Sequence, residues 1–312
     1  MAKLVPETPR GLSRRAFTAG LGALGAAAGL GPVAAAAEPI AKRIPATGEA
    51  LPAIGLGTWI TFNVGDSERL RAERLEVVRT FFAGGGAVID SSPMYGSSEE
   101  VIGHCLGAIG IPDGLFAATK VWTPLRWHGR RQMEASRELW GVERFDLMQV
   151  HNLLGWEGHL ETLAGWKAEG RVRHVGITTS HGRDHETFET VMRSRPIDFV
   201  QFTYNILDRQ AERRLLPLAA ERGLGVIINR PFRQGALVDA VERHPLPEWA
   251  GEIDCANWPQ FLLKFIISHP AVTCAIPATT RADHMAENMG AAMGRLPDAE
   301  MRTRMIRYVE GL

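Results

Sequence analysis

The sequence has 312 residues, 45% of them apolar, and its 35 Lys and Arg residues balance its 35 Asp and Glu residues. The balance excludes a general attraction to nucleic acid or an anionic surface, and the apolar fraction allows one large core. The three cysteines are far apart and lack the spacing of a metal or redox motif, so we expect ordinary, mostly buried thiols.

Residues 1–37 differ in composition from the rest of the chain. A charged head containing Arg14 and Arg15 precedes an uncharged run rich in Ala and Gly, which ends in small residues before Glu38. This order predicts a cleavable export signal, and the arginine pair resembles the twin-arginine motif of proteins that cross the membrane already folded. A retained membrane anchor is the alternative, because about 20 apolar residues can span a bilayer.

An export signal of this kind predicts where residues 38–312 fold and where the mature protein is located. We expect them to fold in the cytoplasm as one domain, to interact with the twin-arginine export machinery, and to become periplasmic or otherwise exported. The mature form is expected to be monomeric and not membrane-spanning. Gly20, Gly22 and Gly25 have the GxGxxG spacing of a dinucleotide-binding loop, but no strand precedes them, so we assign them no nucleotide.

After residue 38, strand-like and helix-like segments alternate along the chain. Apolar runs of strand length lie near residues 53–56, 87–90, 115–120, 145–151, 172–178, 199–203, 224–228 and 272–276. Helix-length stretches between them cover residues 67–83, 98–108, 130–140, 159–168, 184–193, 211–222, 258–268 and 282–293. This order predicts an α/β fold, a (β/α)8 TIM barrel. An open doubly wound sheet is the alternative, although its usual glycine loop is missing.

Two connections stand out from this alternation. Thr47 and Gly48 form a turn between short segments, which predicts an N-terminal β-hairpin over residues 42–51 that could plug the bottom of the barrel. Residues 230–257 form a long connection between the seventh strand and its helix, and long connections inside a compact domain are often functional.

Polar side chains stand at or just after the ends of three successive predicted strands. Reacting groups gather at the C-terminal ends of barrel strands, so we expect Asp90, Tyr95, Lys120 and His151 to share one site. A free tyrosine has a pKa near about 10, and a nearby ammonium lowers it. Lys120, held by Asp90, could thus make Tyr95 a proton donor, while His151 donates a hydrogen bond to a carbonyl oxygen.

Taken singly, each of these four residues has an ordinary structural explanation, such as a loop cap or a solvated charge. As a set, and in this order, they resemble the catalytic tetrad of the aldo-keto reductase superfamily, with further similarity at residues 55–59, 94–103, 200–205 and 276–288. The resemblance covers nearly all of residues 40–295. It implies an NAD(P)H-dependent enzyme that reduces a small-molecule aldehyde or ketone to an alcohol by hydride transfer, with Tyr95 as the general acid.

The resemblance also implies a nicotinamide dinucleotide across the barrel mouth, NADPH in preference to NADH. The carboxamide would bind Thr178, Thr179 and Gln201, although the family more often has Ser-Asn at the first two positions. Asn229 stands where the family often has an aromatic ring under the nicotinamide. The pyrophosphate would lie near Arg230, Pro231, Gly235 and Leu237, with Arg233 as a further candidate. The adenosine end would meet Ala278, Thr279, Thr280, Arg281, His284, Glu287 and Asn288.

Members of the family that prefer NADPH often have a lysine and an arginine where this chain has Ala278 and His284. Arg281 is the residue expected to compensate, because its guanidinium suits phosphate oxygens. For the substrate, four large apolar residues near the predicted mouth could line a pocket. They are Trp59, Met94, Trp122 and Trp156.

Two other interpretations remain. His174, His181, Asp184 and His185 suggest a metal site, but the run spans a strand end, a loop and a helix start with no third ligand fixed, so we expect solvated loop histidines and no metal. The alternative function is a nucleotide-binding barrel that acts as a redox sensor or accessory subunit with little turnover.

Overall fold

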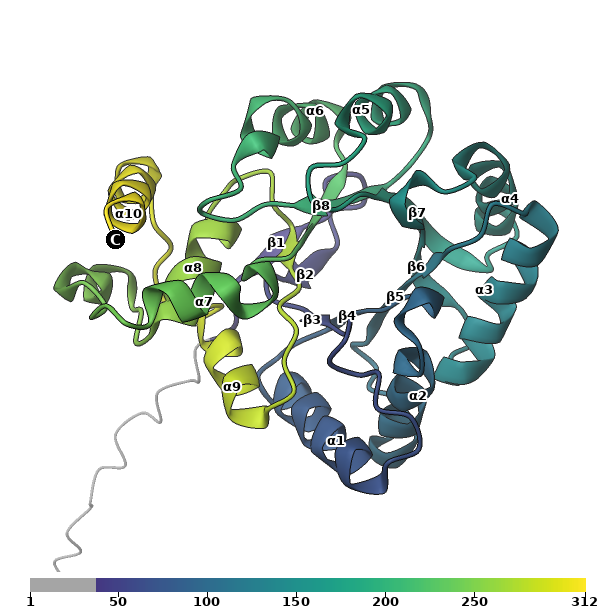
Figure 1. Ribbon diagram of the computed structural model, residues 1–312. Helices are drawn as coiled ribbons and strands as arrows, with labels where there is room; N and C mark the ends of the chain where they lie inside the picture. Colours follow the sequence, from purple (N-terminus) through teal and green to yellow (C-terminus); the bar gives the residue numbers. More distant parts are fainter. Residues whose placement is uncertain (1–37) are drawn as a thin grey trace, which may run out of the picture. The chain divides into compact units, whose positions relative to one another are not determined.

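The computed structural model describes residues 38–312, so the expected export signal of residues 1–37 lies outside the described residues. Within residues 38–312, eight parallel strands follow one another around one sheet in chain order (Figure 1). They are β3 (Leu56–Gly57), β4 (Val88–Asp90), β5 (Phe116–Val121), β6 (Phe145–Val150), β7 (Val172–Thr178), β8 (Phe199–Thr203), β9 (Gly225–Asn229) and β10 (Cys274–Ala275).

The first and last strands meet, which closes the sheet into a barrel. Ala275 donates its backbone N–H to the Ala53 carbonyl at 2.9 Å, and Gly55 donates its own to the Ala275 carbonyl at 2.8 Å. Gly55 also allows the chain to lie close to β4, because a Cβ there would lie 2.8 Å from the Val88 carbonyl oxygen. The predicted (β/α)8 barrel is therefore confirmed.

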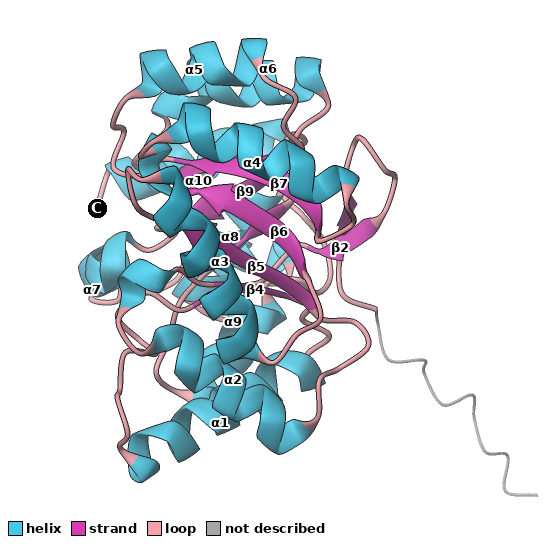
Figure 2. Ribbon diagram, turned by 90° about the vertical axis from the view of Figure 1, so that its right-hand side faces the viewer, coloured by secondary structure: helices cyan, strands magenta, loops and turns pink. Residues whose placement is uncertain are grey.

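Helices surround the strands and lie on both sides of them when the barrel is seen from the side (Figures 1 and 2). Those that match predicted segments are α1 (Glu68–Ala83), α2 (Ser98–Ile109), α3 (Arg126–Trp140), α4 (Trp156–Ala168), α5 (His185–Ser194), α6 (Leu215–Arg222), α8 (Trp258–Ile267) and α9 (Ala282–Gly290). The helix predicted over residues 211–222 is divided into a 3-10 turn and α6. Pro217 explains the division, because proline is tolerated only in the first turn of a helix.

Two helices were not predicted. The long connection contains α7 (Ala236–Val241), and α10 (Ala299–Glu310) follows the barrel. The side chain of Asp298 caps α10, and Arg302 in α10 donates hydrogen bonds to the Ser268 and Tyr204 hydroxyls at 2.7 Å and 2.6 Å. These bonds hold α10 against α8 and the chain just after β8.

The predicted N-terminal hairpin is present as β1 (Ala41–Arg43) and β2 (Ala50–Pro52), which pair antiparallel. Gly48 takes the left-handed backbone conformation (φ +73°) that the turn needs. Ile44 and Leu51 are buried and pack with Phe116 in the barrel interior. The hairpin therefore contributes apolar side chains to the core inside the barrel.

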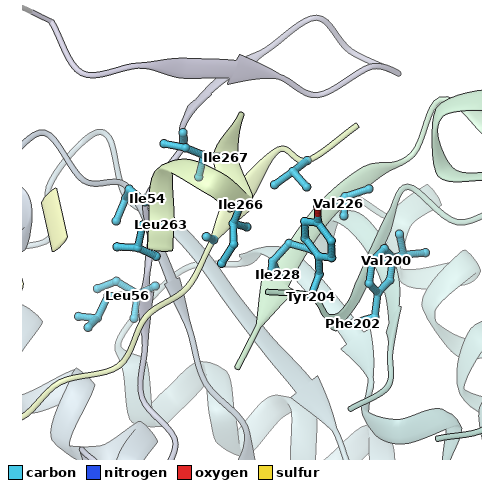
Figure 3. Packing of buried hydrophobic residues seen from close by; sticks show 14 of the residues in the cluster. Ile54, Leu56, Val200, Phe202, Tyr204, Val226, Ile228, Leu263, Ile266 and Ile267 are labelled. Atoms are coloured by element: carbon cyan, nitrogen blue, oxygen red, sulfur yellow. The ribbon is translucent and has the colours of Figure 1, made fainter. Parts of the chain in front are cut away.

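A second apolar layer fills the space between the strands and the outer helices. Figure 3 shows part of it, where Leu263, Ile266 and Ile267 of α8 lie close to Ile228 of β9 and to Ile54, which precedes β3. Burial removes these side chains from water and fixes the strand ends that carry the polar residues.

The three cysteines are buried and unpaired, as expected. Burial raises the pKa of Cys105 to about 12 and that of Cys255 to about 11, so both thiols stay protonated and unreactive at neutral pH. No helix in the described residues is long and apolar enough to cross a membrane.

Glu99 is a buried acid that connects α2 to β5 and α3. Its carboxylate accepts hydrogen bonds from the Thr119 hydroxyl at 2.5 Å and the Ser136 hydroxyl at 2.8 Å. Burial raises its pKa above the usual 4.5, and the two hydroxyls only partly oppose this. The native state therefore holds this proton to higher pH than the unfolded state, and stability falls as pH rises above about 4.5.

The change Glu99→Gln is accordingly expected to raise Tm by about 2–4 °C at pH 8 and by much less at pH 5, because glutamine cannot ionise. Thermal unfolding at the two pH values measures this difference. Exposed Glu143 supplies the control, Glu143→Gln, which should leave Tm unchanged. An equal gain at both pH values would show that packing, and not the proton, is responsible.

Candidate active site

The four predicted catalytic residues come together at the C-terminal ends of adjacent strands. Asp90 is the last residue of β4, Lys120 lies near the end of β5, and His151 directly follows β6. Tyr95 ends a 3-10 turn (Pro93–Tyr95) that begins just after β4. Residues up to 61 positions apart in the sequence, from Asp90 to His151, thus share one site.

Lys120 and Asp90 form an ion pair inside the barrel, with side chains only 0% and 2% exposed. The ammonium also donates to the Ser91 carbonyl at 2.8 Å. Burial alone would lower the pKa of Lys120, but Asp90 and Tyr95 raise it above its usual value. Lys120 is therefore a fixed positive charge at neutral pH.

Two amide side chains hold Asp90 from the side opposite Lys120. Gln149 and Gln201 each donate an N–H to Asp90 Oδ1 at 2.9 Å, while Oδ2 accepts from Lys120. Gln149 was not predicted. The alternation of side chains in a strand could have indicated it, because Gln149 lies two positions before His151 and therefore on the same face.

Tyr95 lies close to both the ion pair and His151. Lys120 Nζ is 5.2 Å from the centre of the Tyr95 ring, and the His151 ring is 5.7 Å away and nearly perpendicular. Burial raises the pKa of Tyr95, and Lys120 lowers it by a smaller amount. The expected net lowering was wrong, because burial exceeds the effect of the ammonium. Tyr95 therefore carries its proton at neutral pH.

His151 is buried, and its Nδ1 lies 2.8 Å from the Ser92 hydroxyl oxygen. Burial and the nearby Lys120 charge hold its pKa well below 6.5, so the imidazole is neutral at pH 7. A neutral histidine carries one ring proton and can donate one hydrogen bond.

Of the residues predicted to bind the carboxamide, Thr178 and Thr179 lie at the end of β7 and Gln201 lies within β8, while Asn229, predicted to lie under the nicotinamide, ends β9. Thr178 Oγ1 accepts the Asn152 N–H at 3.0 Å, and Thr179 Oγ1 donates to the Arg183 carbonyl at 2.7 Å. Asn229 donates to the Thr179 carbonyl at 2.9 Å and lies 3.4 Å from Gln201 Oε1. Asn229 thus connects the Thr179 backbone to the Gln201 side chain, whereas the hydroxyls of Thr178 and Thr179 bond to backbone groups elsewhere. Carboxamide binding at these residues stays a prediction.

The two predicted phosphate partners, Arg230 and Arg233, differ in whether their guanidinium groups already have hydrogen-bond partners. Arg233 Nε donates to Asp208 Oδ2 at 2.8 Å, whereas Arg230 Nη1 is buried without a hydrogen-bond partner among residues 38–312. An unsatisfied buried guanidinium group fits an anionic ligand. Of the other residues predicted there, Pro231 and Leu237 are buried, and Gly235 has a φ of +97° that favours glycine.

The residues predicted for the adenosine end surround the start of α9. Arg281 forms an exposed ion pair with Asp283, with Nε and Oδ1 2.9 Å apart. Asp283 was not considered from the sequence, although it is only two positions from Arg281. Of the remaining residues, Thr279 and Asn288 are buried, Glu287 is half-buried, and three are exposed, namely Ala278, Thr280 and His284.

The four predicted pocket residues have different surroundings. Trp59 and Met94 are half-buried, and Trp122 is exposed just after β5. Trp156 packs against the core and has the Arg195 guanidinium 5.1 Å from its ring centre, which indicates a packing role. Sequence reasoning missed other exposed apolar residues that follow barrel strands, namely Ile60, Leu125, Trp127 and Leu207.

The expectation of solvated loop histidines was wrong for His174. It lies inside β7, is buried, and packs on the rings of Phe116 and Phe199 at 6.0 Å and 5.4 Å. The strand alternation turns its side chain into the barrel. In the part of the chain that the structure describes, no three His, Cys, Asp or Glu residues are grouped so that they could hold a metal ion.

Comparison with known proteins gives a consistent set of relatives. The sequence model of the aldo/keto reductase family matches residues 53–305. Aldo-keto reductase YhdN of Bacillus subtilis is 28% identical over 211 residues, 61% of this chain and 61% of that protein, so this match spans less than two thirds of the relative. The NADH-specific methylglyoxal reductase of Escherichia coli is 24% identical over an alignment of 335 residues, 87% of this chain and 99% of that protein.

Solved structures have the same fold. The crystal structure of an aldo/keto reductase from Klebsiella pneumoniae in complex with NADP and acetate has a TM-score of 0.71 at 25% identity. That similarity covers 88% of this chain and 96% of the Klebsiella chain.

Proposed function

This chain belongs to the aldo/keto reductase family of NAD(P)H-dependent oxidoreductases, and we propose that it reduces an aldehyde or ketone to an alcohol with Tyr95 as the proton donor. The observation that carries the proposal is the buried Lys120–Asp90 ion pair beside a protonated Tyr95 and a neutral His151.

A bound nicotinamide nucleotide would supply the hydride that reduces the carbonyl carbon. His151 would orient the carbonyl by a hydrogen bond to its oxygen, and Tyr95 would give that oxygen its hydroxyl proton. Lys120 would stabilise the phenolate that remains, because its charge lies 5.2 Å from the ring centre. Asp90, Gln149 and Gln201 would keep the ammonium in place. Solvent would then return the proton to Tyr95.

A direct assay tests this function. The purified chain is mixed with NADPH or NADH and a panel of aromatic and aliphatic aldehydes and ketones, and nucleotide oxidation is followed together with alcohol formation. We expect turnover with several of these carbonyls, since Trp59, Met94 and Trp122 would form an open, apolar site. Nucleotide binding without any alcohol product across the panel would contradict the enzymatic proposal.

That second outcome would favour the redox sensor or accessory subunit. One observation supports this alternative: the hydroxyls of Thr178 and Thr179 already have backbone partners, and the Gln201 amide N–H points to Asp90. A carboxamide would have to share these groups. Single-turnover oxidation of bound NADPH separates the two functions, because a sensor would bind without reacting.

We propose NADPH as the preferred nucleotide and NADH as the alternative, since a similar Klebsiella protein was crystallised with NADP and an Escherichia coli relative is named NADH-specific. The sites that would hold the phosphates are Arg230, for the pyrophosphate, and Arg281, for the 2′-phosphate. Asp283 is paired with the Arg281 guanidinium, so its negative charge would repel a 2′-phosphate that approaches Arg281.

The change Asp283→Ala is therefore expected to lower KM for NADPH about two- to fivefold and to leave KM for NADH unchanged, because an exposed charge pair has a modest energy. Arg281→Ala should have the opposite effect on NADPH. Initial rates over a range of each nucleotide give the two KM values. If Asp283→Ala alters both nucleotides equally, the pair does not face the 2′-phosphate.

We further propose that residues 1–37 direct the protein through the twin-arginine machinery after it has folded around its nucleotide, because the sequence Ser13-Arg14-Arg15-Ala16-Phe17 precedes the uncharged run. A freely exchanging nicotinamide nucleotide is scarce outside the cytoplasm, so prior binding would carry it across. Native mass spectrometry of the exported protein would report the cleavage site and any bound nucleotide together. An exported form without nucleotide, with equal activity of signal-deleted protein in the cytoplasm, would contradict this proposal.

A further inference from the structure

Ser92 contacts both residues that would bind the substrate oxygen. Its hydroxyl oxygen is 2.8 Å from His151 Nδ1, and its carbonyl accepts the Tyr95 backbone N–H at 2.9 Å. The serine side chain is 0% exposed. We propose that Ser92 is a positioning residue that fixes His151 in the tautomer with the proton on Nε2, so that the ring presents a donor to the carbonyl oxygen. This inference rests on the proposed carbonyl reduction.

The hydrogen bonds around the Ser92 hydroxyl determine the tautomer. Its oxygen accepts the Met94 backbone N–H at 3.2 Å, and an amide N–H can only donate. Among residues 38–312, the only other polar partner of this hydroxyl is His151 Nδ1. The hydroxyl proton therefore has one acceptor, and Nδ1 must be unprotonated to accept it.

The opposite arrangement would be costly. If Nδ1 carried the proton and donated to Ser92, the buried hydroxyl would accept two hydrogen bonds and have no acceptor for its own proton. A buried donor without a partner loses its full hydration energy. Because burial and Lys120 keep the His151 ring neutral, its single proton must then be on Nε2.

The backbone of Ser92 holds this arrangement in place. The residue is extended (φ −164°, ψ 146°) and caps the 3-10 turn that carries Tyr95. The Tyr95 and His151 rings are nearly perpendicular, at 86°, with centres 5.7 Å apart. Ser92 thus holds the backbone of Tyr95 through its carbonyl and the ring of His151 through its hydroxyl.

The tautomer can be read directly by NMR of the full chain labelled with 15N-histidine. Of the 10 histidines, His151 is assigned by comparison with a His151→Gln variant. We expect the wild-type His151 signals to show an unprotonated Nδ1 and a protonated Nε2. A wild-type protein with the proton on Nδ1 would overturn the inference. This measurement needs neither a substrate nor a Ser92 variant that folds.

Variants then test the role in turnover. Ser92→Ala should produce a mixture of His151 tautomers and lower kcat about tenfold, with little change in nucleotide KM, since one buried hydrogen bond is lost. Ser92→Thr keeps the hydroxyl and should restore the wild-type tautomer and most of kcat. The matched control is Ser98→Ala, which removes another fully buried serine hydroxyl, bonded to the Thr58 carbonyl at 3.3 Å.

The outcomes separate this inference from the proposed function. An unchanged tautomer and unchanged kcat in Ser92→Ala would contradict the role of Ser92 while leaving carbonyl reduction intact. A wild-type chain that reduces no carbonyl but has the Nε2 proton would contradict the proposed function alone. Equal losses in Ser92→Ala and Ser98→Ala would assign the effect to general packing and also contradict the positioning role.

Discussion

Replacing Tyr95 by phenylalanine is expected to lower kcat for aldehyde reduction by about 10²–10⁴-fold, because the variant cannot donate a proton to the developing alkoxide. The ring itself stays, so packing against His151 and the Lys120 charge should change little. Nucleotide binding should persist, since Tyr95 is not among the residues expected to bind the nucleotide. The loss should therefore appear in kcat and much less in the dissociation constant of NADPH.

The chain offers a matched control in Tyr308→Phe. The Tyr308 hydroxyl lies in α10 and donates to the Pro245 carbonyl at 3.3 Å, outside the active site. Steady-state rates with one aldehyde, together with fluorescence titration of NADPH, compare wild type and the two variants. Equal rates for wild type and Tyr95→Phe would remove Tyr95 from the mechanism and with it the assignment of a tyrosine acid.

Residues at strand ends were the part of the site that the sequence could predict. Asp90, Lys120 and His151 each follow an apolar run of strand length, and parallel strands in a barrel bring such ends together. The closed barrel followed from the same alternation. The helix α10 was missed, although Asp298 and the four-residue spacing of Met301, Met305 and Val309 are the signals of a capped helix.

Side-chain contacts between distant residues could not be predicted in the same way. Ser92 and His151 are 59 positions apart, and no local pattern indicates that a hydroxyl meets that ring nitrogen. The direction of the Tyr95 pKa depends on how much burial opposes the Lys120 charge, which is a property of packing. The contact of Gln149 with Asp90, also 59 positions apart, likewise became evident only from the geometry, although the alternation of β6 indicates which face Gln149 shares.

The Lys120–Asp90 ion pair provides the second large effect. Lys120→Met should abolish measurable turnover and lower the free energy of unfolding by about 3–5 kcal/mol, because it leaves the Asp90 carboxylate buried without its counter-ion. Both side chains are almost fully enclosed, so water cannot replace the ammonium. Gln149 and Gln201 still donate to Asp90, but neutral amides compensate a full charge only in part.

A double variant separates stability from catalysis. Lys120→Met combined with Asp90→Asn removes both charges and should recover most of the lost stability, whereas turnover should stay absent. Urea unfolding at pH 7 and aldehyde reduction by the same preparations measure the two properties. A double variant no more stable than Lys120→Met would contradict the unpaired-charge explanation. Recovered stability without turnover would mean that the barrel folds without this pair. The Lys120 ammonium would then serve to stabilise the Tyr95 phenolate, and Asp90 would be present because a buried ammonium needs a counter-ion.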